Sequence, residues 1–201
     1  NEVQKEEWTK VKGRFQELVF VEPIEQLLYL ASTQIDASRT IQYEDSVIDS
    51  LASLAKKTGF VSQNFSGVTA QALAPLEPFA AYVITQAIQR YGQNERSLFS
   101  FLNARGRNSL SEYEGKIYQL QCCYDYIYYN FYSYLKEANA DSMQWSSMQV
   151  AIERVEGQLW DTKTDLVDAI KLVKAIGLLN LFGNASFKMS REDTALYAKT
   201  A

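Results

Sequence analysis

Apolar residues recur along most of the chain at spacings of three and four, which is the period of an α-helix. The repeat is strict between residues 110 and 135, where we expect one long helix with a buried seam of Leu110, Tyr113, Ile117, Leu120, Tyr124, Ile127, Phe131 and Tyr134. Shorter helices are predicted at 1–12, 24–35, 44–57, 75–91, 145–159 and 165–182, with a further helix from residue 190 onwards. The pattern therefore predicts a mainly α fold.

Two stretches depart from the helical period. Residues 61–75 mix Ser, Asn, Gly and Thr, a composition that predicts a loop. Residues 15–21 form a short apolar run rich in β-branched and aromatic side chains, closed by Glu22 and Pro23, and predict a strand. We expect a multi-helix bundle with this one short strand near the N-terminus.

The stretch "RYGQNERSLFSFL", residues 90–102, places a polar cluster directly before a group of large apolar side chains. Gly92 is a natural helix stop, and the helical period resumes after it. The stretch therefore predicts a helix–turn–helix corner. Its second helix should be held in the core by four buried anchors, namely Leu98, Phe99, Phe101 and Leu102.

Composition bounds the class of protein. The chain has 201 residues, of which 47% are hydrophobic and 22% charged, with a net charge of −4. These values are ordinary for a globular protein with a sizeable core, and no run approaches the ~20 apolar residues of a membrane span. We expect a soluble, cytoplasmic protein without membrane contact. The first residue is Asn1 rather than Met, so we expect either that something was removed upstream or that this is a piece cut from a longer protein.

Residue types restrict the chemistry further. The chain contains no histidine, which excludes Ser-His-Asp and Cys-His catalysis within it. Cys122 and Cys123 are adjacent and point in different directions in a helix, so we expect two reduced thiols in or near the core. Two thiols without histidine cannot complete an ordinary zinc site. Paired-carboxylate chemistry stays open, since 24 acidic residues offer many pairs.

Three stretches together resemble one family: "EEWTKVKGRFQELVFVEPIEQLLYL" (6–30), "LAPLEPFAAYVITQAIQRYGQNERSLFSFL" (73–102) and "AIKLVKAIGLLNLFG" (169–183). They are similar to segments of large bacterial P-loop ATPases of the AAA+ and STAND classes, including ATPases found near anti-phage defence systems. The chain has no phosphate-binding G-x-x-x-x-G-K-S/T loop. The resemblance therefore implies the back half of an ATPase module, with ATP and Mg²⁺ bound by the parent protein and no cofactor in this piece.

The resemblance also implies a division into three parts. Residues 1–35 would be the tail end of the ATPase core, with helix, strand and helix, and residues 36–160 would form the helical lid. Residues 161–201 would begin a winged-helix-like segment that the chain end truncates. The expected partners are the rest of the parent ATPase, further copies in a homo-oligomer, and an effector protein.

The same resemblance suggests roles for individual residues. Arg96, at G-x-x-x-R spacing from Gly92, occupies the place of a lid arginine that senses the terminal phosphates of the nucleotide; alternatively, it pairs with Glu95 or Glu77. Arg14, in "KGRF", is the candidate for an arginine inserted into a neighbouring subunit's site, against a plain solvated residue. A winged helix would allow DNA contact through Lys171, Lys174, Lys188 and Arg191.

Two functions from different classes follow. The first is a lid or regulatory part of a P-loop ATPase that couples nucleotide state to a partner or effector and is inactive alone. The alternative is a helical protein–protein interaction domain without a nucleotide role, in which the 110–135 seam pairs with another protein. The tyrosines of that seam could also stack nucleic-acid bases, although core packing is the simpler interpretation.

Overall fold

The computed structural model describes residues 23–35, 45–92, 95–104, 106–136, 140–183 and 189–200, without the side chains of Asp45, Glu95 and Arg96. Over these residues the chain is mainly helical, as the sequence predicts. The predicted helix at 1–12, the predicted strand at 15–21, Arg14 and Lys188 lie outside the described residues. Within the described part, strand-like pairing is confined to one parallel bridge between Leu76 and Tyr118.

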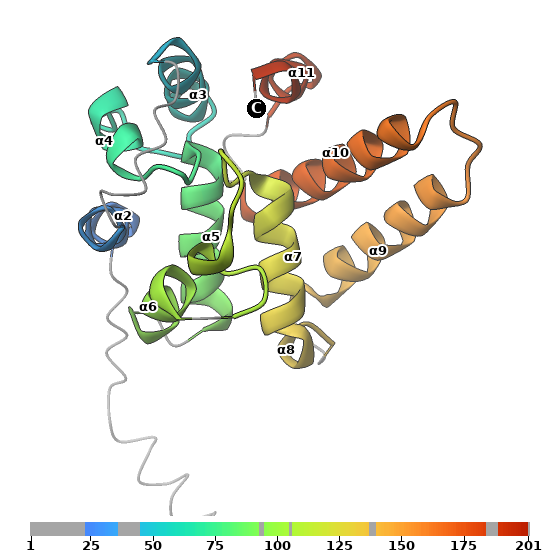
Figure 1. Cartoon of the computed structure of the whole chain (residues 1–201), viewed down its shortest axis with the longest axis horizontal. Helices are drawn as coiled ribbons and strands as arrows, with labels where there is room; N and C mark the ends of the chain where they lie inside the picture. Colours follow the sequence, from blue (N-terminus) through green and yellow to red (C-terminus); the bar gives the residue numbers. More distant parts are fainter. Residues whose placement is uncertain are drawn as a thin grey trace, which may run out of the picture.

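Helix α5 (Pro78–Tyr91) is the central element of the fold. Pro78 stands in its first turn, where a missing N–H leaves no hydrogen bond unmade, and most of the helix is buried on several sides. Helices α2 (Ile24–Gln34), α3 (Asp45–Lys57), α7 (Leu120–Asn130) and α10 (Lys163–Phe182) pack around it. Figure 1 shows α5 standing between α2, α4 and α6 on one side and α7 on the other.

The predicted loop at 61–75 contains a helix, so that prediction was wrong in part. Helix α4 (Gly67–Ala72) begins after Ser66, whose hydroxyl accepts a hydrogen bond from the backbone N–H of Thr69 at 3.1 Å. This N-cap satisfies a donor that would otherwise be unpaired at the helix start. A single capped turn-and-a-half is too short to show helical periodicity in the sequence.

The two helices of the predicted helix–turn–helix corner are confirmed. Helix α5 ends at Tyr91 and α6 (Glu95–Asn103) begins at Glu95, while residues 93 and 94 between them lie outside the described residues. Leu98, Phe101 and Leu102 are buried, whereas Phe99 is only partly buried. Three of the four predicted anchors therefore lie in the core.

The predicted single helix over 110–135 was wrong. The structure has a short 3-10 turn (Leu110–Glu112), an irregular segment at 113–119, α7, and a short α8 (Tyr132–Lys136). The irregular segment lies alongside residues 75–77, because the N–H of Tyr118 donates to the carbonyl of Pro75 at 2.8 Å and the N–H of Glu77 donates to the carbonyl of Tyr118 at 3.3 Å. These long-range bonds replace the local helical ones, so that tertiary pairing overrides the helical period.

The seam residues of that stretch are nevertheless largely internal. Leu120, Tyr124 and Ile127 are buried on α7, and Tyr113, Ile117 and Phe131 pack partly buried against the core. Tyr134 remains 40% exposed. The aromatic rings pack against one another and against helices α5, α6 and α9, which supports core packing for most of the seam.

Helices α9 (Ser142–Glu156) and α10 form an antiparallel hairpin that extends away from the body of the molecule (Figure 1). The first of them ends at Glu156, short of the predicted end at Leu159, whose side chain is fully exposed. Thr162 caps α10 by accepting from the N–H of Asp165 at 3.1 Å. We name this pair of helices the arm.

Helix α11 (Arg191–Thr200) begins where the sequence predicts. Ser190 and Asp193 form the expected capping box: the N–H of Asp193 donates to the Ser190 hydroxyl, and the N–H of Ser190 donates to the Asp193 carboxylate. In the described part of 161–201 the structure contains α10 and α11 without a strand. The winged-helix-like start thus stays a prediction.

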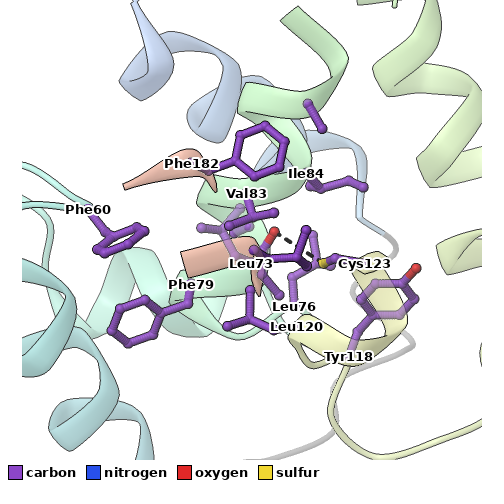
Figure 2. Packing of buried hydrophobic residues seen from close by; sticks show 14 of the residues in the cluster. Phe60, Leu73, Leu76, Phe79, Val83, Ile84, Tyr118, Leu120, Cys123 and Phe182 are labelled. Atoms are coloured by element: carbon purple, nitrogen blue, oxygen red, sulfur yellow. Dashed lines mark hydrogen bonds between the residues drawn. The ribbon is translucent and has the colours of Figure 1, made fainter. Parts of the chain in front are cut away.

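One continuous hydrophobic core joins the described helices. Figure 2 shows part of it, with Phe60, Phe79, Val83, Leu120 and Phe182 converging from distant parts of the sequence. Residues from all three predicted parts enter this core, and the predicted boundaries at 35 and 160 stay predictions. Among the helices described, none combines the length and the apolar character that crossing a membrane requires.

Candidate functional site

The predicted lid arginine lies on the first turn of α6. Arg96 is the second residue of this helix, and its side chain is outside the described atoms. The turn that follows is fixed by Phe101, whose ring meets Tyr118 and Tyr126 edge-on at centroid distances of 5.5 and 4.8 Å. Leu98 and Leu102 complete the buried face. The backbone that carries Arg96 is therefore held by a helix packed into the core.

The other arginine of this corner has a structural partner that the sequence did not reveal. Arg90, in the last turn of α5, forms an ion pair with Asp141 at 3.0 Å, and its guanidinium lies 4.9 Å from the centre of the Phe182 ring. Tyr91 donates to the same carboxylate at 2.7 Å and accepts from the Trp145 indole N–H at 3.2 Å. This network joins the end of α5 to the start of α9, so the role of Arg90 is structural.

The structure pairs two of the basic residues predicted to contact DNA with carboxylates. Lys174 pairs with Asp125 at 2.6 Å and lies over the Tyr124 ring, while Lys171 pairs with Asp168 at 3.0 Å. Arg191 is exposed at the start of α11. Carboxylates beside both lysines weaken the positive field that a phosphate backbone requires. DNA contact stays a prediction with little geometric support.

The most unusual group in the described structure is a buried carboxyl. Glu77 immediately precedes α5 and is fully buried, between Leu76 and Pro78. Its Oε1 accepts from the backbone N–H of Leu120 at 3.1 Å and from the hydroxyl of Tyr197. Its Oε2 has no hydrogen-bond partner among the described residues. Burial raises the pKa of Glu77 from 4.5 to about 8, and the two hydrogen bonds oppose this only in part.

The sequence contains a weak signal for the burial of this carboxyl, beyond its candidacy as a partner for Arg96. Glu77 is the single charged residue in the long apolar stretch "FSGVTAQALAPLEPFAAYVI". A lone acid in such surroundings is often buried together with polar partners. Which partners these are could not be read from the sequence, because Leu120 and Tyr197 lie far along the chain.

A cavity of about 440 Å³ is lined in part by Tyr197, the hydroxyl donor to Glu77. Its walls come from the start of α7, from α10 and from α11, and include Gln119, Gln121, Asp168, Lys171, Leu172 and Tyr197. Tyr197 lies between the two features, because its side chain lines the cavity and its hydroxyl donates to Glu77. The chemistry that this arrangement offers is proton exchange at a buried carboxyl that Tyr197 covers.

The remaining candidate groups are structural. Cys123 lies in the core as predicted, with its thiol 3.6 Å from the carbonyl oxygen of Ala80 (the dashed line in Figure 2). Cys122 is half-buried, and burial raises the pKa of both thiols, which keeps them protonated and unreactive. Within the described residues, no cluster of acidic and cysteine side chains has the make-up of a metal site.

Comparison with protein-family models, with curated proteins and with solved structures finds no match for this chain. The resemblance to P-loop ATPases thus depends on the three quoted stretches alone. What it implies for Arg96 and Arg14 stays a prediction. The geometry contributes one point, namely that the helix that carries Arg96 is anchored in the core by Leu98, Phe101 and Leu102.

Proposed function

We propose that this chain is the helical lid and regulatory part of a cytoplasmic P-loop ATPase of the AAA+/STAND type, and that it couples nucleotide state to a partner or effector. The observation that supports this proposal best is the α5–α6 corner. It carries Arg96 on the first turn of a short helix, while the next turn is fixed by Leu98, Phe101 and Leu102.

The physical argument concerns position. An arginine stabilises the developing charge of a transferring phosphoryl group only if its guanidinium is held in place when the reaction occurs. An arginine on a helix that is anchored in the core suits a residue that reads the terminal phosphates of a nucleotide.

The proposal assigns the remaining parts to the parent protein. The phosphate loop, the Mg²⁺-binding acid and hence ATP hydrolysis would belong to the upstream half, because this chain contains no G-x-x-x-x-G-K-S/T loop. Arg14 would act between subunits of a homo-oligomer. The segment 161–201, with its predicted winged-helix-like start, would serve packing or regulation.

The test is ATP hydrolysis by the parent protein with Arg96→Ala. We expect turnover to decrease about tenfold or more, which corresponds to roughly 1.4 kcal/mol or above of lost transition-state stabilisation, while the melting temperature stays unchanged. Arg154→Ala is the matched control, since Arg154 is an exposed arginine on α9. Unchanged turnover in Arg96→Ala would remove this residue from the site. A collapsed melting temperature would assign it a structural ion pair instead.

The alternative function, a helical interaction domain without a nucleotide role, would need a different surface from the one that the sequence suggested. Leu120, Tyr124 and Ile127 of the predicted seam are already covered by the chain's own helices. A partner helix would have to displace them from the core. The lid proposal requires no such rearrangement.

A further inference from the structure

We propose that helix α11 is a releasable latch that docks over Glu77, and that its docking is coupled to the protonation of this carboxyl. The inference does not depend on the ATPase proposal, because it rests on contacts between described residues alone. In it, the protonated carboxyl favours the docked helix, and the ionised carboxyl favours its release.

The first argument is that α11 has few apolar anchors. Its buried residues are Asp193 and Tyr197, and its one large aliphatic side chain, Leu196, is 49% exposed. Asp193 pairs with Lys57 of α3 at 2.7 Å, but the Lys57 side chain is 68% exposed, and such pairs contribute little to stability. Docking therefore depends mainly on Tyr197.

Tyr197 makes two contacts at the docking point. Its ring meets Phe79 of α5 edge-on at a centroid distance of 5.3 Å, and its hydroxyl donates to Oε1 of Glu77. The helix thus covers the carboxyl and excludes water from it. Figure 1 shows α11 at the periphery of the fold, beside α3.

The second argument is the environment of Glu77. The titratable groups that face it are Tyr197 from α11 and the thiols of Cys122 and Cys123 from α7, all neutral near pH 7. From α7 it also receives the Leu120 N–H, and it forms no ion pair within the described part of the chain. An ionised Glu77 would consequently be a buried charge without a cation, with one oxygen lacking any hydrogen bond.

Release of α11 removes this penalty, because water can then solvate the carboxylate. Burial holds the pKa of the docked group near 8, and exposure returns it toward 4.5. By linkage, the docking equilibrium weakens as pH rises through this window and levels off above about pH 8. The equilibrium constant for docking can decrease by at most tenfold for each pH unit, and burial that remains after release makes the decrease smaller.

Release would also change the cavity of about 440 Å³ described above. Tyr197 and Ala198 form its α11 wall, so departure of the helix removes that wall. Protonation of Glu77 and the shape of this cavity are therefore coupled through one side chain, Tyr197.

The test is amide hydrogen exchange on the whole chain between pH 6 and 8.5, corrected for the intrinsic pH dependence of exchange. We expect exchange of the α11 amides to increase at least tenfold across this range, and to remain faster than exchange of the α5 amides at every pH. Exchange of α11 that does not change with pH would overturn the proposal. Equal opening free energies for α5 and α11 at every pH would also overturn it, since they would indicate that α11 opens only by global unfolding.

Two variants sharpen the test. Glu77→Gln keeps an oxygen for both hydrogen bonds and cannot ionise, so exchange of α11 in this variant should not respond to pH. The control is Glu192→Gln, on the exposed face of α11, which should behave like the wild type.

If Glu77→Gln fails to fold, Tyr197→Phe measured at pH 6 tests the same contact. It keeps the ring against Phe79 but removes the donor, and should increase α11 exchange at least threefold, with α11 still exchanging faster than α5. Wild-type exchange in Tyr197→Phe would contradict the latch.

Discussion

At the scale of single residues, Glu77 shows how a protein retains a carboxyl in its core. Isolated burial of an ionised group is strongly unfavourable, so a buried acid either finds a cation or keeps its proton. Among the described residues Glu77 has no cation, and two donors converge on one of its oxygens. The neutral form is thus the one that suits the fold near neutral pH.

This gives a prediction for stability. The pKa of Glu77 in the folded chain, about 8, lies above its ordinary value of 4.5, so the folded chain keeps a proton that the unfolded chain releases in this window. The free energy of unfolding should therefore decrease as pH rises from 5 to 8, by on the order of 3 kcal/mol, and change little above that. Urea unfolding at successive pH values measures it.

Glu77→Gln should remove this pH dependence, because the amide does not titrate. The free energy of unfolding is measured against pH for the wild type and for the variant. Subtracting one profile from the other cancels the titration of every other group. Superimposable profiles for wild type and variant would show that the carboxyl is solvated, or paired with a cation, in solution.

At the scale of elements, the contact between α9 and α10 depends on a missing side chain. A Cβ atom at Gly177 would stand 2.2 Å from Sδ and 2.6 Å from Cγ of Met148, which is buried on α9. Glycine inside a helix costs roughly 0.5–1 kcal/mol relative to alanine. The Met148 side chain occupies the space beside Gly177, which explains why glycine suits the middle of α10.

Enlarging that position should separate the two helices. We expect Gly177→Leu to lower the free energy of unfolding by roughly 1–3 kcal/mol, because the new side chain overpacks the contact with Met148. Asn180→Leu, at an exposed position of the same helix, should change stability by at most about 0.5 kcal/mol. Denaturant unfolding of both variants and of the wild type gives the free energies to compare. Equal effects of the two substitutions would mean that the helices are not in close contact at Gly177.

At the scale of the whole molecule, burial is distributed unevenly. The body around α5 contains most of the core, whereas no residue between Met148 and Ala175 is buried. Apolar side chains of that stretch, Val150, Leu159, Val167 and Leu172 among them, remain exposed. The outer half of the arm thus lies outside the core, and few buried contacts oppose its local opening.

Hydrogen exchange should reveal this difference within one molecule. We expect amides at 151–156 and 164–171 to exchange at least tenfold faster, after correction for intrinsic rates, than those at 83–88 of α5. The amides of α10 near Leu178 and Leu179, which are buried, provide an internal control on the same helix and should resemble α5. Equal protection along α10 would indicate that something covers the arm in solution.

The sequence by itself determined the features that depend on neighbours along the chain. Helical spacing located α2, α3, α5 and α10, and the Ser190–Asp193 capping box located the start of α11, because these signals act within one or two turns. The corner before α6 and its core anchors followed in the same way. Arg96 could be placed on its turn, although the function of its side chain could not be read from local pattern.

The tertiary structure alone decided which segments pair. The 110–135 repeat does not form one helix, because residues 75–77 supply hydrogen bonds that draw the chain out at Tyr118. Glu77 becomes a neutral buried acid only because Leu120 and Tyr197 arrive from elsewhere in the chain. Lys174, predicted as a nucleic-acid contact, instead meets Asp125 across two helices. Helical propensity is a local property, whereas burial, pKa and charge pairing depend on neighbours that only the folded chain brings together.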